Sequence, residues 1–260
     1  MKRIGDVIRT ISIPIGTSTG GTSASEEAVN CPKCKDAGFI RYNVPLGHPK
    51  FGDVFPCDCR EQEREARHVE DLRRLSNLGA FLHHDFASFD PYVDGVEEAY
   101  GVARAYAEDP QGWLFFHGGC GAGKTHLAVA IALHVMEHKG MSVLFAVVPD
   151  LLDHLRSTFD PSSPVGYDKR FEDVRNAGLL ILDDLGTENA TPWAKEKLYQ
   201  IFNYRYNEQL PTVVTSNHNF DRIEERVLSR LLDGRVNRYL AMDAQDYRRR
   251  DARRSPRPGR

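Results

Sequence analysis

Short apolar runs alternate with longer helix-like stretches along most of the chain. The runs lie at 113–117, 142–148, 179–183 and 212–216. Apolar runs of this length without polar alternation are typical of strands buried on both faces, and the stretches between them are typical of helices. We therefore predict an α/β fold, a doubly wound parallel sheet with helices on both faces, over residues 86–246.

The residues ahead of this domain have a different pattern. Residues 1–30 end in a run of small polar residues, which predicts a flexible leader. Residues 31–60 contain two β-prone runs, 38–44 and 53–57, on either side of the turn-rich stretch 46–52. This arrangement predicts a small hairpin module.

Two further segments flank the domain, a helical linker over 61–85 and a basic tail over 247–260. In the linker, Val69, Leu72, Leu75 and Leu78 recur at three-residue steps, as expected on one face of a helix. The tail holds seven arginines and one acid from Arg248 onward, although the whole chain has a formal net charge of -3. Such a tail would attract phosphate groups, and a solubilising tail is an equally good interpretation.

Composition narrows the class of protein. With 260 residues, 41% of them hydrophobic and 27% charged, the chain resembles an ordinary globular protein, and no apolar run approaches the roughly 18 residues of a membrane span. We therefore expect no membrane partner. Asp6 and Arg9 interrupt the stretch that a secretory signal would need to be apolar. A cytoplasmic location is the expectation that follows.

A glycine-rich loop follows the run at 113–117. The loop GGCGAGKT consists of Gly118, Gly119, Cys120, Gly121, Ala122, Gly123, Lys124 and Thr125, and a helix-like stretch follows it. In a strand–loop–helix unit of this kind, backbone N–H groups wrap phosphates, the lysine reaches the terminal phosphates and the threonine binds Mg²⁺. The loop predicts a site for ATP or GTP with Mg²⁺. Cys120 stands at a position that the motif leaves free, where an oxidation-sensitive thiol or a tolerated small residue would fit.

Polar residues end the next two apolar runs. Asp183 and Asp184 follow Leu179–Leu182, and Asn217 follows the run at 212–216. We expect Asp183 to contribute to the Mg²⁺ shell and Asp184 to orient or deprotonate the attacking water. Asn217 would hydrogen-bond the γ-phosphate or that water, although a helix cap is the alternative reading.

Four of the five cysteines are clustered at metal-ligand spacing. Cys31 and Cys34 form one pair, and Cys57 and Cys59 form the other, on either side of the predicted hairpin. Four thiolates on two short loops are typical of a closed Zn²⁺ site, whose binding energy would fold so small a module. His48 is a competing ligand, but its sequence context places it at the end of the hairpin. We predict a zinc-ribbon-like module.

The motifs in this order resemble the AAA+ helicase loaders of the DnaC and DnaI type and the related IstB transposition ATPases. The resemblance covers roughly residues 73–250 and rests on FFHGGCGAGKTHLAVAI, LLILDDLG, TSN, ERVLSRL and DYRRR. It implies an AAA+ ATPase fold, a replicative DNA helicase and single-stranded DNA as partners, and a zinc module that contacts the helicase. Whether the module touches DNA instead stays open.

The resemblance also implies roles for two arginines. Arg230 matches the arginine finger, which reaches the ATP of a neighbouring subunit and so requires a homo-oligomer, and Arg248 matches a late arginine near the nucleotide. Arg226 and Arg230 lie four residues apart, so a surface ion pair with Glu225 or nearby acids is the alternative.

One position departs from the pattern of many AAA+ proteins, which carry Glu where Asp184 stands. The shorter side chain predicts slow hydrolysis, with ATP acting largely as a switch. Two other interpretations stay open: an IstB-like helper in transposition, and an adaptor that binds ATP with little turnover.

Overall fold

The computed structural model describes residues 30–60, 63, 70, 72, 76–159, 166–188, 191–217 and 220–248. The chain divides into a small unit, Met1–Gln62, and a large unit, Glu63–Arg260. The predicted leader apart from Asn30, most of the predicted linker helix, and the tail beyond Arg248 lie outside the described residues. Within the described ranges, no helix combines the length and the apolar character needed to cross a membrane.

The small unit contains a two-stranded antiparallel sheet. Strand β1 (Phe39–Ile40) pairs with β2 (Phe55–Pro56), in the register Phe39 with Pro56 and Ile40 with Phe55. Its core consists mainly of cysteine sulfur, with Ile40 packed beside it. A unit with so small an apolar core needs another source of folding energy.

The large unit is built on a five-stranded parallel sheet. Its strand order is β4-β5-β6-β3-β7, with bounds Val143–Val147, Leu179–Asp183, Thr212–Ser216, Trp113–Gly118 and Asn237–Met242. Every residue of β5 and β6 is buried. The apolar runs therefore lacked polar alternation because both faces of the sheet are covered, as predicted.

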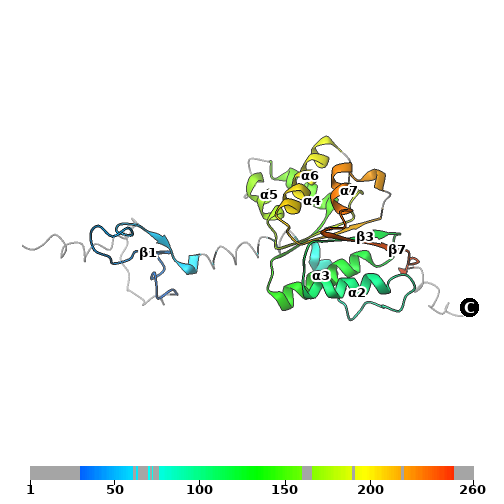
Figure 1. The fold of residues 1–260 in the computed structure, drawn as a ribbon, viewed down its shortest axis with the longest axis horizontal. Helices are drawn as coiled ribbons and strands as arrows, with labels where there is room; N and C mark the ends of the chain where they lie inside the picture. Colours follow the sequence, from blue (N-terminus) through cyan, green and yellow to red (C-terminus); the bar gives the residue numbers. More distant parts are fainter. Residues whose placement is uncertain are drawn as a thin grey trace, which may run out of the picture. The chain divides into compact units, whose positions relative to one another are not determined.

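Helices cover both faces of this sheet (Figure 1). Helices α2 (Glu97–Glu108) and α3 (Lys124–Lys139) pack on one face. The opposite face carries α4 (Val148–Ser157), α5 (Tyr167–Arg175), α6 (Pro192–Asn207) and α7 (Glu225–Leu231). Successive residues of β3 alternate between the two layers, since Leu114 packs toward α3 while Phe115 packs toward the α6 side. The prediction of a doubly wound α/β fold is confirmed.

Residues before position 86 also contribute to the core of the large unit. The short 3-10 helix η3 (Asn77–Phe81) buries Leu78, and the ring of Phe81 lies 5.5 Å from that of Phe145 in β4. A second short 3-10 helix, η4 (Phe220–Arg222), follows β6. Core contacts of the large unit therefore begin upstream of the boundary expected from the strand pattern.

Arg205 in α6 is fully buried, and its hydrogen bonds within the described residues go to neutral acceptors. Its guanidinium donates to the carbonyl oxygens of Arg175, Ala177 and Pro211 and to Oγ1 of Thr212. Burial lowers the pKa of Arg205 to about 9. The hydrogen bonds of this side chain join the end of α5 and the start of β6 to α6.

Candidate functional site

The glycine loop runs from the end of β3 into α3. Gly118 and Gly121 have φ values of 149° and 74°, which glycine adopts readily. A Cβ atom at Gly118 would lie 2.1 Å from the carbonyl oxygen of Met242, and one at Gly121 would lie 1.8 Å from Oδ1 of Asp246. Both the backbone conformation and the close approach of the end of β7 and the residues after it therefore favour glycine at these two positions.

Lys124 is buried at the first turn of α3, with its ammonium group folded onto the loop. Its Nζ donates to the carbonyl oxygens of Gly118 (2.9 Å) and Gly119 (2.6 Å). Burial lowers the pKa of Lys124, which the negative charges of nearby groups, including Asp184 and Asp183, partly oppose. A buried cation whose hydrogen bonds within the described residues go to neutral carbonyls is well placed to receive an anion such as a phosphate.

Asp183, at the end of β5, lies against two threonine hydroxyls. Thr125 Oγ1 donates to its carboxylate, at 3.0 and 3.1 Å from the two oxygens, and Thr215 Oγ1 lies 2.6 Å from Oδ1. Burial raises the pKa of Asp183 to about 6, and the nearby charge of Asp184 contributes to the rise. A carboxylate and a hydroxyl are oxygen ligands of the kind that Mg²⁺ prefers, and a cation here would relieve the buried charge. The residues thus fit Mg²⁺.

Asp184 begins the turn that follows β5, with the left-handed φ of 58°. Its backbone N–H donates to Thr215 Oγ1 at 3.0 Å, and its Oδ1 accepts from Nδ2 of Asn217. Asp184 and Asn217 both face the same cavity. The parallel strands β5 and β6 are neighbours, so their carboxyl ends bring these two side chains together as the sequence predicts.

A cavity of about 440 Å³ lies beside the loop, large enough for a small-molecule ligand. The loop lines it with Cys120, Gly121, Ala122, Gly123, Lys124 and Thr125, and further polar lining comes from His84, Ser88, Asp90, His126, Asp184, Asn217, Gln245, Tyr247 and Arg248. Its apolar lining comes from Phe81, Phe89, Val93 and Val96, which precede α2. An apolar compartment beside a phosphate loop suits a nucleoside base.

Two residues of uncertain role in the sequence also lie at this cavity. Arg248 lines it, and the charge of Arg248 contributes to lowering the pKa of Lys124, which places the two cations near each other. Cys120 is exposed at the same opening. Thr215 was not singled out from the sequence, although a threonine that follows two valines in a strand expected to be buried was a usable signal.

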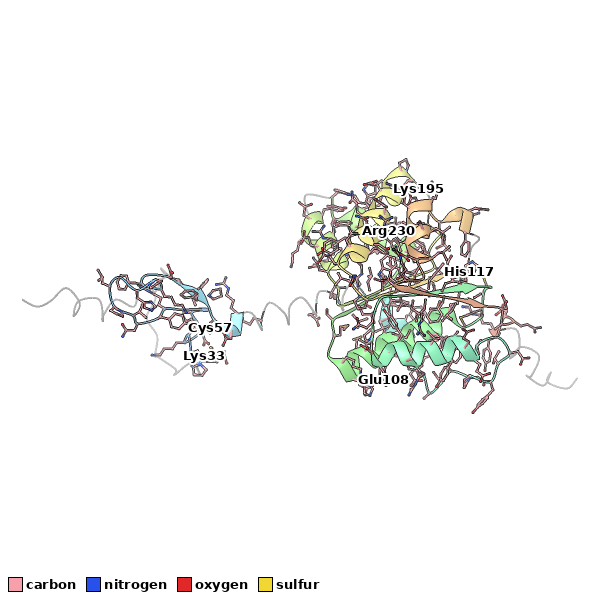
Figure 2. The ribbon with its side chains drawn as sticks, viewed as in Figure 1. Lys33, Cys57, Glu108, His117, Lys195 and Arg230 are labelled. Atoms are coloured by element: carbon pink, nitrogen blue, oxygen red, sulfur yellow. The ribbon has the colours of Figure 1, made fainter. Side chains whose placement is uncertain are left out.

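Arg230 is not part of the cavity in its own chain. It lies on α7, in the layer with α6 (Figure 2), where its guanidinium donates to the carbonyl oxygen of Arg226 (2.8 Å) and to Oδ1 of Asn203 (2.6 Å). The guanidinium groups of Arg226 and Arg230 both lie over the ring of Tyr199, at 3.8 Å and 5.2 Å from its centroid. Arg226 forms an ion pair with Glu224, one of the nearby acids that the alternative interpretation allowed.

The four cysteines converge in the small unit, in which Figure 2 labels Cys57 and Lys33. Their sulfur atoms all lie within 4.8 Å of one another. The Sγ–Sγ distances are 3.8 Å for Cys31 and Cys57 and 3.4 Å for Cys34 and Cys59, close to the roughly 3.8 Å edge of a tetrahedron with Zn–S bonds of about 2.3 Å. The donor set therefore fits Zn²⁺.

Local hydrogen bonds shape the two cysteine loops. The carboxylate of Asp36 accepts from the N–H of Cys31 (2.8 Å), and the N–H of Gly38 donates to Cys34 Sγ (3.3 Å). A backbone hydrogen bond at Cys34 lowers the pKa of Cys31 to about 7, which favours a thiolate. His48 Nδ1 instead accepts from the N–H of Lys50 (3.1 Å), within the turn at the far end of the hairpin sequence.

The parallel sheet, the glycine loop and the acidic strand end together define a P-loop protein of the AAA+ type. The chain belongs to the family of IstB-like ATP binding proteins, whose model matches residues 58–241. The replicative helicase loader DnaC of Escherichia coli strain K12 is 29% identical over 177 residues, which cover 66% of this chain and 71% of that protein. DnaC of Buchnera aphidicola from Acyrthosiphon pisum is 28% identical over 195 residues, covering 71% of this chain and 78% of that protein.

Solved structures agree with this assignment. The crystal structure of the DnaC helicase loader is 28% identical and superposes with a TM-score of 0.56, over 62% of this chain and 97% of that one. The replication initiator DnaA bound to AMPPCP and single-stranded DNA shares the fold, with 20% identity and a TM-score of 0.54 over 62% of this chain and 50% of that one. The resemblance to the DnaC and IstB type of protein is confirmed.

Proposed function

We propose that this chain is an ATP-dependent loader that places a replicative helicase on single-stranded DNA in the cytoplasm. In this proposal residues 31–60 are the zinc module that recognises the helicase, 61–85 are a linker, and 86–246 are the ATPase domain. The observation that carries the proposal is the convergence of Lys124, Asp184 and Asn217 at one cavity, with Asp183 bound to Thr125 at its wall, in a chain similar over most of that domain to DnaC loaders.

The proposed nucleotide chemistry uses the polar groups at the ends of β5 and β6 and in the glycine loop. Lys124 binds the terminal phosphates, and Thr125 and Asp183 hold Mg²⁺, which neutralises the charge that develops on the phosphates. Asp184 orients the attacking water, and Asn217 fixes the carboxylate of Asp184. The Asp184 carboxylate is one methylene shorter than a glutamate would be, so we propose slow hydrolysis in which ATP acts largely as a switch.

An aromatic and cationic surface on α4, α5 and α6 supports contact with single-stranded DNA. Phe159 is 54% exposed, and its ring stacks on Tyr167 at 4.4 Å and lies 6.2 Å from Trp193. Arg156 covers Trp193 at 5.1 Å, and Lys197 covers Tyr167 at 5.2 Å. Rings that accept stacked bases beside cations that attract phosphates are typical of surfaces that bind single strands.

Exposed apolar side chains on the small unit support its role as a protein-binding module. Leu46 is 88% exposed and Val54 is 56% exposed, and Phe39, Tyr42 and Phe51 are also largely open to solvent. So many large apolar side chains in so short a described segment are unusual unless a partner covers them. Exposed apolar groups of this kind suit a protein surface better than a phosphate backbone.

Efficient hydrolysis in this proposal requires a homo-oligomer. Arg230 makes its hydrogen bonds to Arg226 and Asn203 and is not among the residues that line the cavity of its own chain, which supports a role at the nucleotide of a neighbouring subunit. A head-to-tail arrangement of this kind assembles rings or open helical filaments.

The test uses the full chain, the purified replicative helicase of the same organism and single-stranded DNA circles. We expect the wild type with ATP to raise the amount of helicase retained on the circles, and Lys124→Ala to fail while keeping the wild-type melting temperature. Leu46→Ser should weaken capture of the helicase, whereas Leu82→Ser, a matched change of an exposed leucine on the large unit, should not. Equal retention with and without the chain would reject the proposal.

Phe159 provides a separate test of the DNA surface. Phe159→Ala should weaken binding of a fluorescent oligothymidylate about tenfold or more, given the value of one stacked base. Tyr92→Ala is the control, because Tyr92 is strongly exposed but lies outside the aromatic group on α4, α5 and α6. Equal losses in both variants would remove that surface from the proposal.

The family also supports one alternative function, that of an IstB-like helper that delivers a transposase to target DNA. The module with four convergent cysteines favours the loader. Stable binding of a transposase, with no binding of the helicase under the same conditions, would favour the helper instead.

A further inference from the structure

Thr215 in β6 is fully buried and contacts both Asp183, the last residue of β5, and Asp184, which follows it. Its Oγ1 donates to Asp183 Oδ1 at 2.6 Å and accepts from the backbone N–H of Asp184 at 3.0 Å. A hydroxyl has one proton to donate. In this arrangement that proton goes to the carboxylate of Asp183, while the hydroxyl oxygen accepts the N–H of Asp184. One side chain of the neighbouring strand therefore holds two consecutive acidic residues.

The bond to Asp184 matters because that residue has an unfavourable backbone conformation. Its φ of 58° lies in the left-handed region, which costs free energy for a residue with a Cβ. Thr215 holds the turn at two points, since its Oγ1 receives the N–H of Asp184 and its carbonyl oxygen receives the N–H of Leu185 at 2.9 Å. The direction of the Asp184 side chain toward Asn217 depends on this turn.

Packing alone does not explain a threonine at this position. Valine has nearly the same shape, favours strands equally well, and precedes Thr215 at Val213 and Val214. A buried hydroxyl costs free energy unless it is hydrogen-bonded, so its presence points to a requirement for its two bonds. Thr125, the other hydroxyl on Asp183, is itself a proposed Mg²⁺ ligand.

We propose that Thr215 is a positioning residue that fixes Asp183 for Mg²⁺ and Asp184 for the attacking water. This inference rests on the proposed ATP and Mg²⁺ site. It predicts that loss of the hydroxyl weakens the binding of Mg²⁺·ATP more than the binding of ATP alone, because Asp183 acts on the nucleotide through the metal. It also predicts a loss of turnover at saturating Mg²⁺·ATP through Asp184.

The experiment compares Thr215→Val, which removes the hydroxyl at nearly constant volume, with Thr215→Ser, which keeps it. The affinity of the full chain for a fluorescent ATP analogue is measured with Mg²⁺ and with EDTA, and turnover is measured separately. Thr215→Val should lose about tenfold in affinity with Mg²⁺, the effect expected for one hydrogen bond to a charged group, and less than twofold in EDTA. Its kcat should fall about tenfold, and Thr215→Ser should stay within about threefold of wild type in every measurement.

Ser216→Ala is the matched control. Ser216 is equally buried in the same strand, but its hydroxyl donates to the carbonyl oxygen of Leu185 (2.7 Å), so its Mg²⁺ response should equal that of wild type. The inference is overturned if Thr215→Val keeps the wild-type Mg²⁺ response, if Thr215→Ser is as defective as Thr215→Val, or if affinity falls equally in EDTA. If the ATP affinity of the wild-type chain does not depend on Mg²⁺, the proposed ATP and Mg²⁺ site itself is refuted.

Discussion

Asn217 donates a hydrogen bond from Nδ2 to Oδ1 of Asp184. The two residues directly follow the neighbouring parallel strands β6 and β5, and both line the cavity beside the glycine loop. An amide that binds the carboxylate of the proposed water-orienting residue restricts how that carboxylate can turn. The pair therefore links the end of β6 to the position at which hydrolysis would occur.

Asn217→Ala should slow hydrolysis without weakening nucleotide binding. Removal of the amide frees the Asp184 carboxylate, and loss of one preorganised donor in an active site lowers kcat by about a hundredfold. The affinity for Mg²⁺·ATP should change by less than about twofold, measured by equilibrium binding. Asn207→Ala, at the exposed end of α6, is the control and should behave like wild type. A parallel loss of affinity and kcat would mean that Asn217 binds the nucleotide in its ground state.

Arg230→Ala should bind ATP normally and lose most of its turnover, because the proposed finger acts on a neighbouring subunit. Arginine fingers contribute about 10³–10⁵ to the rate in other NTPases. Mixing Arg230→Ala with Asp184→Asn should restore part of the activity, since some interfaces then combine an intact finger with an intact site. The measurement is phosphate release across mixing ratios.

A stability control is needed for this arginine, because it also joins α7 to Asn203 in α6. Loss of that hydrogen bond should cost about 1 kcal/mol of unfolding free energy, which leaves the protein folded. Asn203→Ala loses the same bond but keeps the arginine, so it should retain more activity than Arg230→Ala. Wild-type turnover by Arg230→Ala alone would remove the finger assignment.

The strand pattern and the motifs predicted the parallel sheet. They also predicted that Lys124, Asp183 and Asn217 lie near one another in the structure. This succeeded because the carboxyl ends of parallel strands meet at one edge of the sheet, so a polar residue after each apolar run has a calculable position. The glycine loop was equally readable, since its backbone conformations and close approaches leave few alternatives to glycine.

Other features depend on contacts that no local pattern reveals. Arg205 lies in a polar helix sequence, yet it is buried, because its acceptors come from Arg175, Ala177 and Pro211, which are distant along the chain or lie in loops. The apolar lining of the cavity by Phe81 and Phe89 comes from a segment without a strand or an α-helix. Neither periodicity nor composition marks such residues.

Cys34→Ser should release the metal that we propose for the small unit and unfold that unit alone. The core there is mainly cysteine sulfur, so little apolar burial remains once the metal is lost. The zinc content of the full chain, measured by elemental analysis, should fall from about one ion per chain to near zero. ATP affinity should be unchanged, since the residues of the nucleotide cavity all belong to the large unit.

Helicase capture should be lost in the same Cys34→Ser preparation, because Leu46 and Val54 would no longer be held in place. Cys120→Ser is the matched control, as Cys120 lies in the large unit and should keep both zinc and capture. A Cys34→Ser chain that retains one zinc would refute the ligand set. One that loses zinc yet captures the helicase would move the partner site to the large unit.

Asp183→Asn should stabilise the metal-free protein at neutral pH while abolishing its response to Mg²⁺. Burial raises the pKa of Asp183 from 3.8 to about 6, so between these values the folded chain binds more protons at this site than the unfolded chain does. The contribution of Asp183 to the free energy of unfolding therefore falls as pH rises through that window. Above pH 6 the charged carboxylate lowers that free energy by its full amount, at most about 3 kcal/mol.

An asparagine carries no charge to bury, so the variant should gain up to that amount at pH 7.5 and gain almost nothing at pH 4. Urea unfolding followed by tryptophan fluorescence measures the difference, because Trp113 and Trp193 both lie in the large unit. Thr125→Val tests whether the hydroxyl on Asp183 accounts for the effect, and it should not reproduce the gain, because the buried charge remains. A gain for Asp183→Asn that is equal at pH 4 and pH 7.5 would show that packing, and not the buried carboxylate, sets the stability at this position.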